Sequence, residues 1–146
     1  LCGTFFQVIS LRGHQTHPER ARRGLKVEAL GLRLTPLARV VNGEAAAEPY
    51  LGKVAVAAVI LNRVESDKFP NTMAGVIYQR HAFESITNGI ANAAPSQDSI
   101  KAAQDAINGW DPTQASLFFW NPAKPVSKWI WTRKIITQIG GHVFGI

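Results

Sequence analysis

The sequence has 146 residues, a mass of 15.9 kDa and a formal net charge of +6. Its hydrophobic content of 46% and charged content of 18% are typical of an ordered globular protein and exclude an intrinsically disordered one. The length suits one domain with a real hydrophobic core. The basic balance suits an anionic partner, whether nucleic acid, membrane or an acidic wall polymer, and does not choose among them.

The first 34 residues carry most of the excess positive charge, with six Arg or Lys against two Glu, compared with ten against eight in residues 35–146. Residues 1–11 are mildly apolar but lack a basic n-region and a small-residue cleavage site, so they do not form a complete signal peptide. They are also shorter than the roughly 18 apolar residues of a membrane-spanning helix. We therefore predict a basic, poorly ordered arm or linker over residues 1–34, a folded domain over residues 35–146, and no membrane span.

The N-terminal segment offers little chemistry. Cys2 is the only cysteine, which excludes an internal disulfide. His14 and His17 have no Cys or acidic cluster beside them, so we predict no metal site and no cofactor. The arginines at 20–23 lack the interleaved aromatic residues of a nucleic-acid-binding segment, so a solvated linker is expected instead and no nucleic-acid partner is predicted.

The first predicted helix carries the candidate catalytic acid. Thr35 is expected as its N-cap and Pro36 as its first helical residue. Its apolar stripe starts at Leu37 and reaches Glu44, which lies about 20° from Leu37 on the helical wheel. No basic residue lies one turn away, and Glu48 follows at i+4, so Glu44 is expected to favour its protonated form, as a general acid requires. The alternatives are a solvated position or an ion pair across the fold, with Arg63, Lys128 or Arg133.

A second helix over residues 51–64 is expected to form the central post of the core. Pro49 restricts the residue before it to extended geometry and is expected to end the first helix. Residues 54–61 are eight consecutive apolar residues, and their length and alanine content favour a helix over a buried strand. The helix that carries Glu44 is expected to pack against this post.

Two shorter helices and a long loop follow. The turn at residues 69–72 is expected to cap a short helix, and Ser96 is expected to cap an amphipathic helix that Gly109 stops. Residues 80–95 between them are predicted to form a polar loop long enough to make a groove wall. Phe83 in this loop fits a sugar-stacking platform and a loop anchor equally well.

The last third of the chain is typical of β-structure and contains all four tryptophans. Strands are expected at residues 115–120 and 129–131, with two more short ones within residues 135–144. An indole face suits the C–H face of a sugar ring, although any single Trp fits a core position equally well. Because all four tryptophans lie within 22 residues, we expect one or two of them to line a polysaccharide groove. Asn121, Lys128 and Arg133 are expected to form the polar and basic rim of this groove.

Several long segments resemble one known family. Residues 40–79 read VVNGEAAAEPYLGKVAVAAVILNRVESDKFPNTMAGVIYQ, and the later segments NGWDPTQASLFFWNPAK, SKWIWTR and IGGHVF follow in the same order. These segments are similar to the SleB/CwlJ-type cell wall hydrolases, the catalytic domain of spore cortex-lytic enzymes. The resemblance covers residues 36–146. The chain departs from the family at residues 46–47, where Ala-Ala stands in place of the usual Arg-Gly or a similar pair, and this departure changes the expected charge of the groove.

The resemblance implies an α+β fold, lysozyme-like and related to resuscitation-promoting factors, with a helical core and a small antiparallel sheet from the C-terminal third. It implies an extracytoplasmic enzyme, in the cell wall or spore cortex, that acts on peptidoglycan as its partner. The Glu of the Gly-Glu-Ala motif, Glu44, is the implied catalytic acid. We expect a monomer. The expected substrate-binding residues are Glu48, Tyr50, Phe83, Trp120, Asn121, Lys128, Trp129 and Arg133.

The expected mechanism depends on the number of carboxylates. Hydrolytic glycosidases usually use two, about 5 Å or 6.5–9.5 Å apart. Glu48 is too near Glu44 in sequence to act from the opposite face of a sugar ring, and no persuasive sequence context supports the other candidates, Asp67, Glu84 and Asp111. The resemblance implies a lytic transglycosylase, which needs only one carboxyl group. Its acid protonates the glycosidic oxygen between N-acetylmuramic acid and N-acetylglucosamine and then accepts the C6 hydroxyl proton, leaving a 1,6-anhydro end.

Four alternatives stay open from the residues alone. A two-carboxylate muramidase would leave reducing ends. A stem-peptide amidase would usually need zinc, for which His81 and His142 lack a matching ligand set. A catalytically silent module would bind peptidoglycan without releasing fragments, and a nucleic-acid binder would lose affinity steeply with salt.

Overall fold

The computed structural model of the chain describes residues 34–146. The predictions for the basic arm, Cys2, His14 and His17 therefore lie outside the described residues. The helices, in chain order, are α3 (Leu34–Ala45), α4 (Tyr50–Glu65), α5 (Met73–Ile77), α6 (Glu84–Thr87), the 3-10 helix η1 (Ile90–Asn92), α7 (Gln97–Ile107) and the 3-10 helix η2 (Lys128–Thr132). The described strands are β1 (Phe118–Trp120), β2 (Ile135–Ile139) and β3 (His142–Gly145). No helix within residues 34–146 has the length and apolarity needed to cross a membrane.

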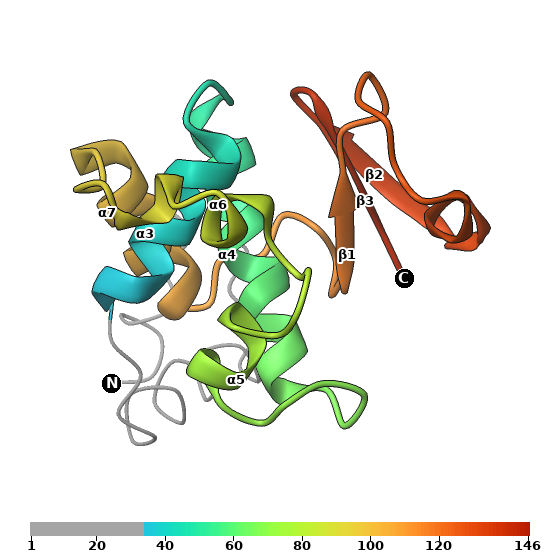
Figure 1. The fold of residues 1–146 in the computed structure, drawn as a ribbon, viewed down its shortest axis with the longest axis horizontal. Helices are drawn as coiled ribbons and strands as arrows, with labels where there is room; N and C mark the ends of the chain where they lie inside the picture. Colours follow the sequence, from blue (N-terminus) through green and yellow to red (C-terminus); the bar gives the residue numbers. More distant parts are fainter. Residues whose placement is uncertain (1–33) are drawn as a thin grey trace, which may run out of the picture.

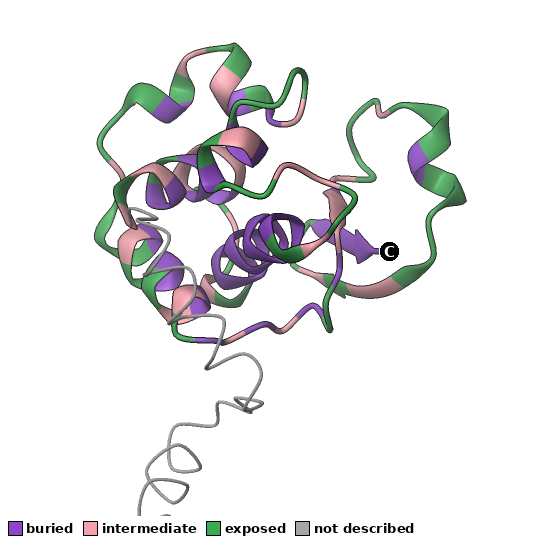
Figure 2. Ribbon diagram, turned by 90° about the horizontal axis from the view of Figure 1, so that it is seen from below, coloured by how far each residue is buried: buried purple, intermediate pink, exposed green. Residues whose placement is uncertain are grey.

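The central post is α4, as the apolar run predicts. Residues 52–64 are all buried, and α3, α5 and α7 pack around them. Figure 1 shows the α-helices gathered on one side of the molecule and the three strands on the other, and Figure 2 shows α4 buried along nearly its whole length. Both α3 and the sheet are therefore held in place by the same helix, which fixes where Glu44 lies relative to the strands.

The boundary between α3 and α4 differs from the prediction. The first helix ends at Ala45, and Pro49 serves as the N-cap of α4 rather than as the end of α3. The turn between them is held by the buried ammonium group of Lys53, whose Nζ donates to the carbonyl oxygens of Ala46 (3.0 Å) and Glu48 (2.7 Å). These tertiary hydrogen bonds stop the first helix one turn before the proline. At its other end α3 already includes Thr35, the predicted N-cap.

The two predicted side-chain caps are confirmed. Thr72 Oγ1 accepts from the backbone N–H of Gly75 at the start of α5, and Ser96 Oγ accepts from the N–H of Ser99 at the start of α7. Such caps satisfy backbone donors that have no partner within the helix. The predicted polar loop over residues 80–95 is partly wrong, because it includes the one-turn helices α6 and η1.

We expect Ser96→Ala to lower the free energy of unfolding by about 1 kcal/mol, because it removes the α7 cap. The hydroxyl also bonds Ser99 Oγ at 3.0 Å, so both contacts are lost together. Urea denaturation measures the change, and Ser96→Asp, which keeps a capping oxygen, is the matched control. Equal stability of the alanine variant and the parent would contradict the role of this cap.

The sheet is antiparallel with the strand order β1-β3-β2, so the last described strand is the central one. Because side chains alternate along a strand, its two faces pack against different partners. Phe119 and Phe144 pack into the helical core, whereas Trp120 and Val143 form a second small cluster with Ile130 of η2. The predicted C-terminal sheet is confirmed, and η2 covers the face of it that points away from the helices.

Two strand predictions in this region are wrong in detail. The strand expected from residue 115 begins only at Phe118, because Gln114 and Ala115 adopt positive φ angles of 54° and 66°, which strands do not accommodate. The strand expected at residues 129–131 is the helix η2. Its backbone groups bond locally, since the N–H of Ile130 donates to Ser127 and that of Arg133 to Ile130, so no strand edge is paired there.

Candidate active site

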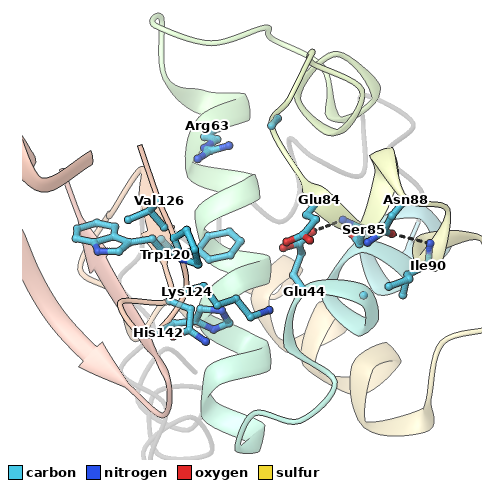
Figure 3. Close-up of a pocket in the computed structure, with 15 residues that line it drawn as sticks. Glu44, Arg63, Glu84, Ser85, Asn88, Ile90, Trp120, Lys124, Val126 and His142 are labelled. Atoms are coloured by element: carbon cyan, nitrogen blue, oxygen red, sulfur yellow. Dashed lines mark hydrogen bonds between the residues drawn. The ribbon is translucent and has the colours of Figure 1, made fainter. Parts of the chain in front are cut away.

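A pocket of about 280 Å³ lies between the helices and the sheet. Its lining comes from α3, α4, α6 and η1 on one side and from β1, β3 and the loop after β1 on the other. Figure 3 shows Glu44 and Glu84 on the helical side, facing Lys124 and His142 on the side of the sheet, with Arg63 farther along α4. The pocket therefore brings together side chains from parts of the chain almost a hundred residues apart.

Glu44 reaches the pocket from the last turn of α3, half-buried. Its Oε1 accepts a hydrogen bond of 2.9 Å from the backbone N–H of Ser85, in the first turn of α6. This contact fixes the orientation of the carboxyl group and leaves Oε2 as the oxygen available to another partner. A carboxyl group held in this way at the wall of an open pocket can exchange a proton with a bound molecule.

Arg63, one of the three cations considered as ion-pair partners of Glu44, is engaged elsewhere. Arg63 Nε donates to the carbonyl oxygen of Leu117 (2.7 Å), and its guanidinium lies 5.0–5.6 Å from the ring centres of Phe69, Phe83 and Phe118. Burial lowers the pKa of Arg63 to about 10, so the group stays protonated at neutral pH. Its contacts tie α4 to the sheet, and the structure gives it no ion pair with Glu44.

Close contact between α3 and α6 depends on Gly43. A Cβ atom at this position would lie 2.4 Å from Ser85 Cβ and 2.8 Å from Ser85 Oγ, distances that real side chains do not tolerate. Gly43 therefore lets Ser85 come close enough to reach the neighbouring carboxylate. Sequence reasoning missed both residues. The available signal was a glycine inside a helix, which costs about 1 kcal/mol relative to alanine and calls for a packing reason.

Glu84 brings a second carboxylate to the pocket. Figure 3 shows its carboxylate pointing toward that of Glu44, and the side chain is exposed. The other two candidates lie elsewhere: Asp67 is exposed in the α4–α5 connection, and buried Asp111 accepts hydrogen bonds from Asn62 and from its own turn. Glu84 is thus the one of these three that the structure brings to Glu44.

His142 forms part of the opposite wall, from the start of β3. It is 7% exposed, and its ring lies edge-on to Phe119, with 5.3 Å between ring centres. Burial lowers the pKa of His142 below its ordinary value, although the carboxylates of Glu48 and Glu44 act in the opposite direction. The imidazole is therefore neutral at neutral pH, and its Nδ1, 3.7 Å from Glu48 Oε1, is beyond hydrogen-bonding distance. Sequence reasoning considered this residue only as a zinc ligand; within residues 34–146 no cluster of three potential ligands forms.

Comparison with known proteins decides the family. Residues 47–145, more than half of the chain, match the family model described as Cell Wall Hydrolase. The chain belongs to the cell wall hydrolase family. The matched range begins three residues after Glu44, so the family match itself does not include the candidate acid.

Other cell wall hydrolases with curated names are similar to this chain. A spore cortex-lytic enzyme of Bacillus cereus is 54% identical over 108 residues, which are 74% of this chain and 42% of that protein. Cell wall hydrolase CwlJ of Bacillus subtilis is 28% identical over 115 residues, covering 74% of this chain and 80% of that protein. The chain thus spans less than half the length of the B. cereus enzyme.

Two solved structures share the fold of this cell wall hydrolase. The catalytic domain of the Bacillus cereus SleB protein matches with a TM-score of 0.73 and 51% identity, over 77% of this chain and 88% of that one. The catalytic domain of a germination-specific lytic transglycosylase, SleB from Bacillus anthracis, matches with a TM-score of 0.74 and 51% identity. The match covers 77% of this chain and 93% of that one. The expected mostly helical domain with a small C-terminal sheet is therefore confirmed.

Two residues predicted to bind substrate lie away from the pocket of this cell wall hydrolase. Glu48 Oε2 accepts from the N–H of Gly141 (2.8 Å), which fastens the α3–α4 turn to the β2–β3 turn. Gly140 permits this contact, since it has φ of +58° and a Cβ there would clash with the carboxylate. The Tyr50 hydroxyl donates to Asp105 and joins α4 to α7, and burial raises the pKa of this phenol above its ordinary value. Binding of substrate by either residue stays a prediction.

The remaining predicted residues divide into three groups. Trp120 and Asn121 line the pocket with Glu44. Phe83 is 2% exposed and stacks on Phe119, a placement that favours the loop-anchor alternative over the sugar platform. The third group lies in or directly after η2, on the far face of the sheet, and consists of Lys128, Trp129 and Arg133.

Proposed function

We propose that this cell wall hydrolase cleaves the glycan strands of peptidoglycan as a lytic transglycosylase, outside the cytoplasm in a cell wall or spore cortex. The observation that carries the proposal is Glu44 at the wall of an open pocket, with one carboxyl oxygen held by Ser85 N–H and the other left available. The 51% identity to a protein named a germination-specific lytic transglycosylase supports it.

In the proposed mechanism Glu44 acts first as an acid and then as a base. Its protonated Oε2 donates to the glycosidic oxygen between N-acetylmuramic acid and N-acetylglucosamine, and the bond from that oxygen to the anomeric carbon of muramic acid breaks. The resulting carboxylate then accepts the proton of the muramoyl C6 hydroxyl as O6 bonds to the anomeric carbon. The proton returns to Glu44, no water is consumed, and the product carries a 1,6-anhydro end.

One residue on the sheet side is proposed to hold the sugar. Asn121 Oδ1 accepts from the backbone N–H of Ala123 (2.9 Å), which turns its Nδ2 donors away from that turn and makes them available to an acetamido carbonyl. Trp120 also lines the pocket, but its buried ring packs with Val143 and Ile130 on the far face of the sheet. Neutral His142 adds a polar group without a charge, so the positive charge on that wall comes from Lys124.

A two-carboxylate muramidase is the second candidate function, and the position of Glu84 favours it. Glu84 lines the same pocket as Glu44, so it is the candidate for the second carboxyl group that a hydrolytic glycosidase uses. In that mechanism one carboxyl group protonates the leaving oxygen and the other activates water or forms a covalent intermediate, so water enters the product. The two functions therefore differ in whether the new end contains an oxygen atom from solvent.

Digestion of purified peptidoglycan in ¹⁸O-labelled water tests the choice. We expect muropeptides with anhydro ends, lighter by one water than reducing-end products and free of the label, as measured by mass spectrometry. Glu84→Gln, the matched control, is expected to give the same anhydro products. Labelled reducing ends would contradict the transglycosylase mechanism and support the muramidase. Protein that sediments with peptidoglycan but releases no fragments would contradict both.

A further inference from the structure

The helix η2 presents an exposed surface that the proposed reaction does not use. Five exposed side chains form it, and we call it the η2 face: Lys128, Trp129, Trp131, Arg133 and Lys134. Because Trp120 and Val143 pack with Ile130 while Phe119 and Phe144 pack into the helical core, η2 covers the sheet on the side opposite to Glu44. Figure 1 shows the chain after β1 extending beyond the sheet, away from the helices.

Both indoles of the η2 face are exposed and held in place. Trp129 is 52% exposed and meets Phe118 edge-on, with 5.6 Å between ring centres. Trp131 is 51% exposed and meets Trp120 edge-on at 5.7 Å. The small cluster under η2 is closed by Ile130, which is buried, so neither exposed indole is needed to fill it. Large aromatic side chains held this way offer flat contact surface at little cost in conformational entropy.

The charged side chains of the segment that carries these indoles have one sign. Residues 112–146 contain four Lys or Arg and no Asp or Glu, and all four cations are exposed. The guanidinium of Arg133 lies 5.5 Å from the ring centre of Trp129 and 5.5 Å from that of Phe118, so it is stacked beside an indole. Cations placed next to exposed aromatic faces fit a polymer that offers both sugar rings and anionic groups.

We propose that the η2 face is a second binding surface for peptidoglycan, separate from the pocket. The indoles stack on sugar rings and the cations pair with carboxylates of the peptide stems. A strand or stem bound there keeps the enzyme on the insoluble polymer between cuts without entering the pocket. This inference rests on the proposed substrate, and it accounts for the position of Lys128, Trp129 and Arg133, which do not line the pocket of Glu44 yet have side chains suited to a wall polymer.

The test separates binding to the polymer from cleavage. We expect the double variant Trp131→Ala/Lys134→Gln to bind intact sacculi at least tenfold more weakly in co-sedimentation, measured in a Glu44→Gln background that leaves the polymer uncut. With Glu44 restored, the same variant is expected to solubilise sacculi more slowly but to cleave a short soluble glycan fragment at the parent rate. Tyr78→Ala removes an aromatic side chain that is 68% exposed at the end of α5, and as the matched control it is expected to change neither result.

Charge variants keep the test decisive if loss of the indole disturbs the fold. Lys128→Gln/Lys134→Gln changes only exposed side chains, and it is expected to weaken sacculus binding and its dependence on salt. Parent-like sedimentation of both double variants would overturn the inference while leaving the proposed cleavage intact. The inference would also be overturned if the double variants lost binding to anionic lipid vesicles while their binding to sacculi stayed unchanged. Sacculus binding that depends on the η2 face in a protein without glycan cleavage would support the inference and contradict the proposed function.

Discussion

Glu44→Gln is expected to abolish glycan cleavage and leave the fold unchanged. The glutamine amide oxygen can still accept the hydrogen bond from Ser85 N–H, so the side chain keeps its place, but the amide cannot donate a proton to the glycosidic oxygen. General acid–base catalysis typically contributes about 10²–10⁴-fold to a rate, and here one group serves in both steps. We therefore expect a loss of at least about 10³-fold in fragment release, measured by muropeptide analysis.

The control for this variant is the other carboxyl group at the pocket. Glu84→Gln removes a charge from the same region, and we expect it to retain most of the activity because the proposed transglycosylase needs one carboxyl group. Urea denaturation of both variants is expected to stay within about 0.5 kcal/mol of the parent, since neither change creates a cavity. A Glu44→Gln protein that still clears peptidoglycan would remove Glu44 from the mechanism.

Gly43→Ala is expected to damage both activity and stability. In an isolated helix alanine is better than glycine by about 1 kcal/mol. Here its Cβ would lie 2.4 Å from Ser85 Cβ, so α6 has to move away from α3 and the hydrogen bond from Ser85 to Glu44 is lost. We expect overpacking to cost about 1–3 kcal/mol in unfolding free energy and the misplaced carboxyl group to cost about 10²-fold in rate.

A second change can reverse the damage. Ser85→Gly removes the Cβ atom that the added methyl group would strike and keeps the backbone N–H that holds Glu44, so the double variant Gly43→Ala/Ser85→Gly is expected to regain much of the activity. Gly52→Ala, another glycine inside a helix, has its nearest contact at 3.1 Å, with Glu48 Cβ, which would have to shift by a few tenths of an ångström, and it is expected to cost less than Gly43→Ala. Full activity of Gly43→Ala alone would show that the close approach of α6 does not matter for the reaction.

The features that follow from local sequence could be predicted. The burial of α4 follows from eight consecutive apolar residues, and the Thr72 and Ser96 caps join groups only three residues apart. The wrong strand at residues 129–131 has a physical cause. Trp-Ile-Trp alternates as a half-buried strand does, but one short helical turn also buries Ile130 and exposes its neighbours.

The partners of the candidate site could not be predicted from periodicity. Ser85 lies 41 residues from Glu44, and Gly141 lies 93 residues from Glu48. Such pairs form only because α3 and the sheet pack against α4 and α6 packs against α3, and no local pattern records that arrangement. The helical wheel placed Glu44 on the packed side of its helix, whereas the division of the aromatic residues between two faces of the sheet became visible only with the strand order.

The order of the strands also bears on when during synthesis this domain becomes complete. A chain leaves the ribosome from its N-terminal end, so α3 and α4 emerge well before β3. Until β3 emerges, β1 and β2 have no strand to pair with and the wall that His142 contributes is missing. A nascent chain can thus assemble its helices around the candidate acid early, yet it closes the site only when the residues from 142 onward have been added.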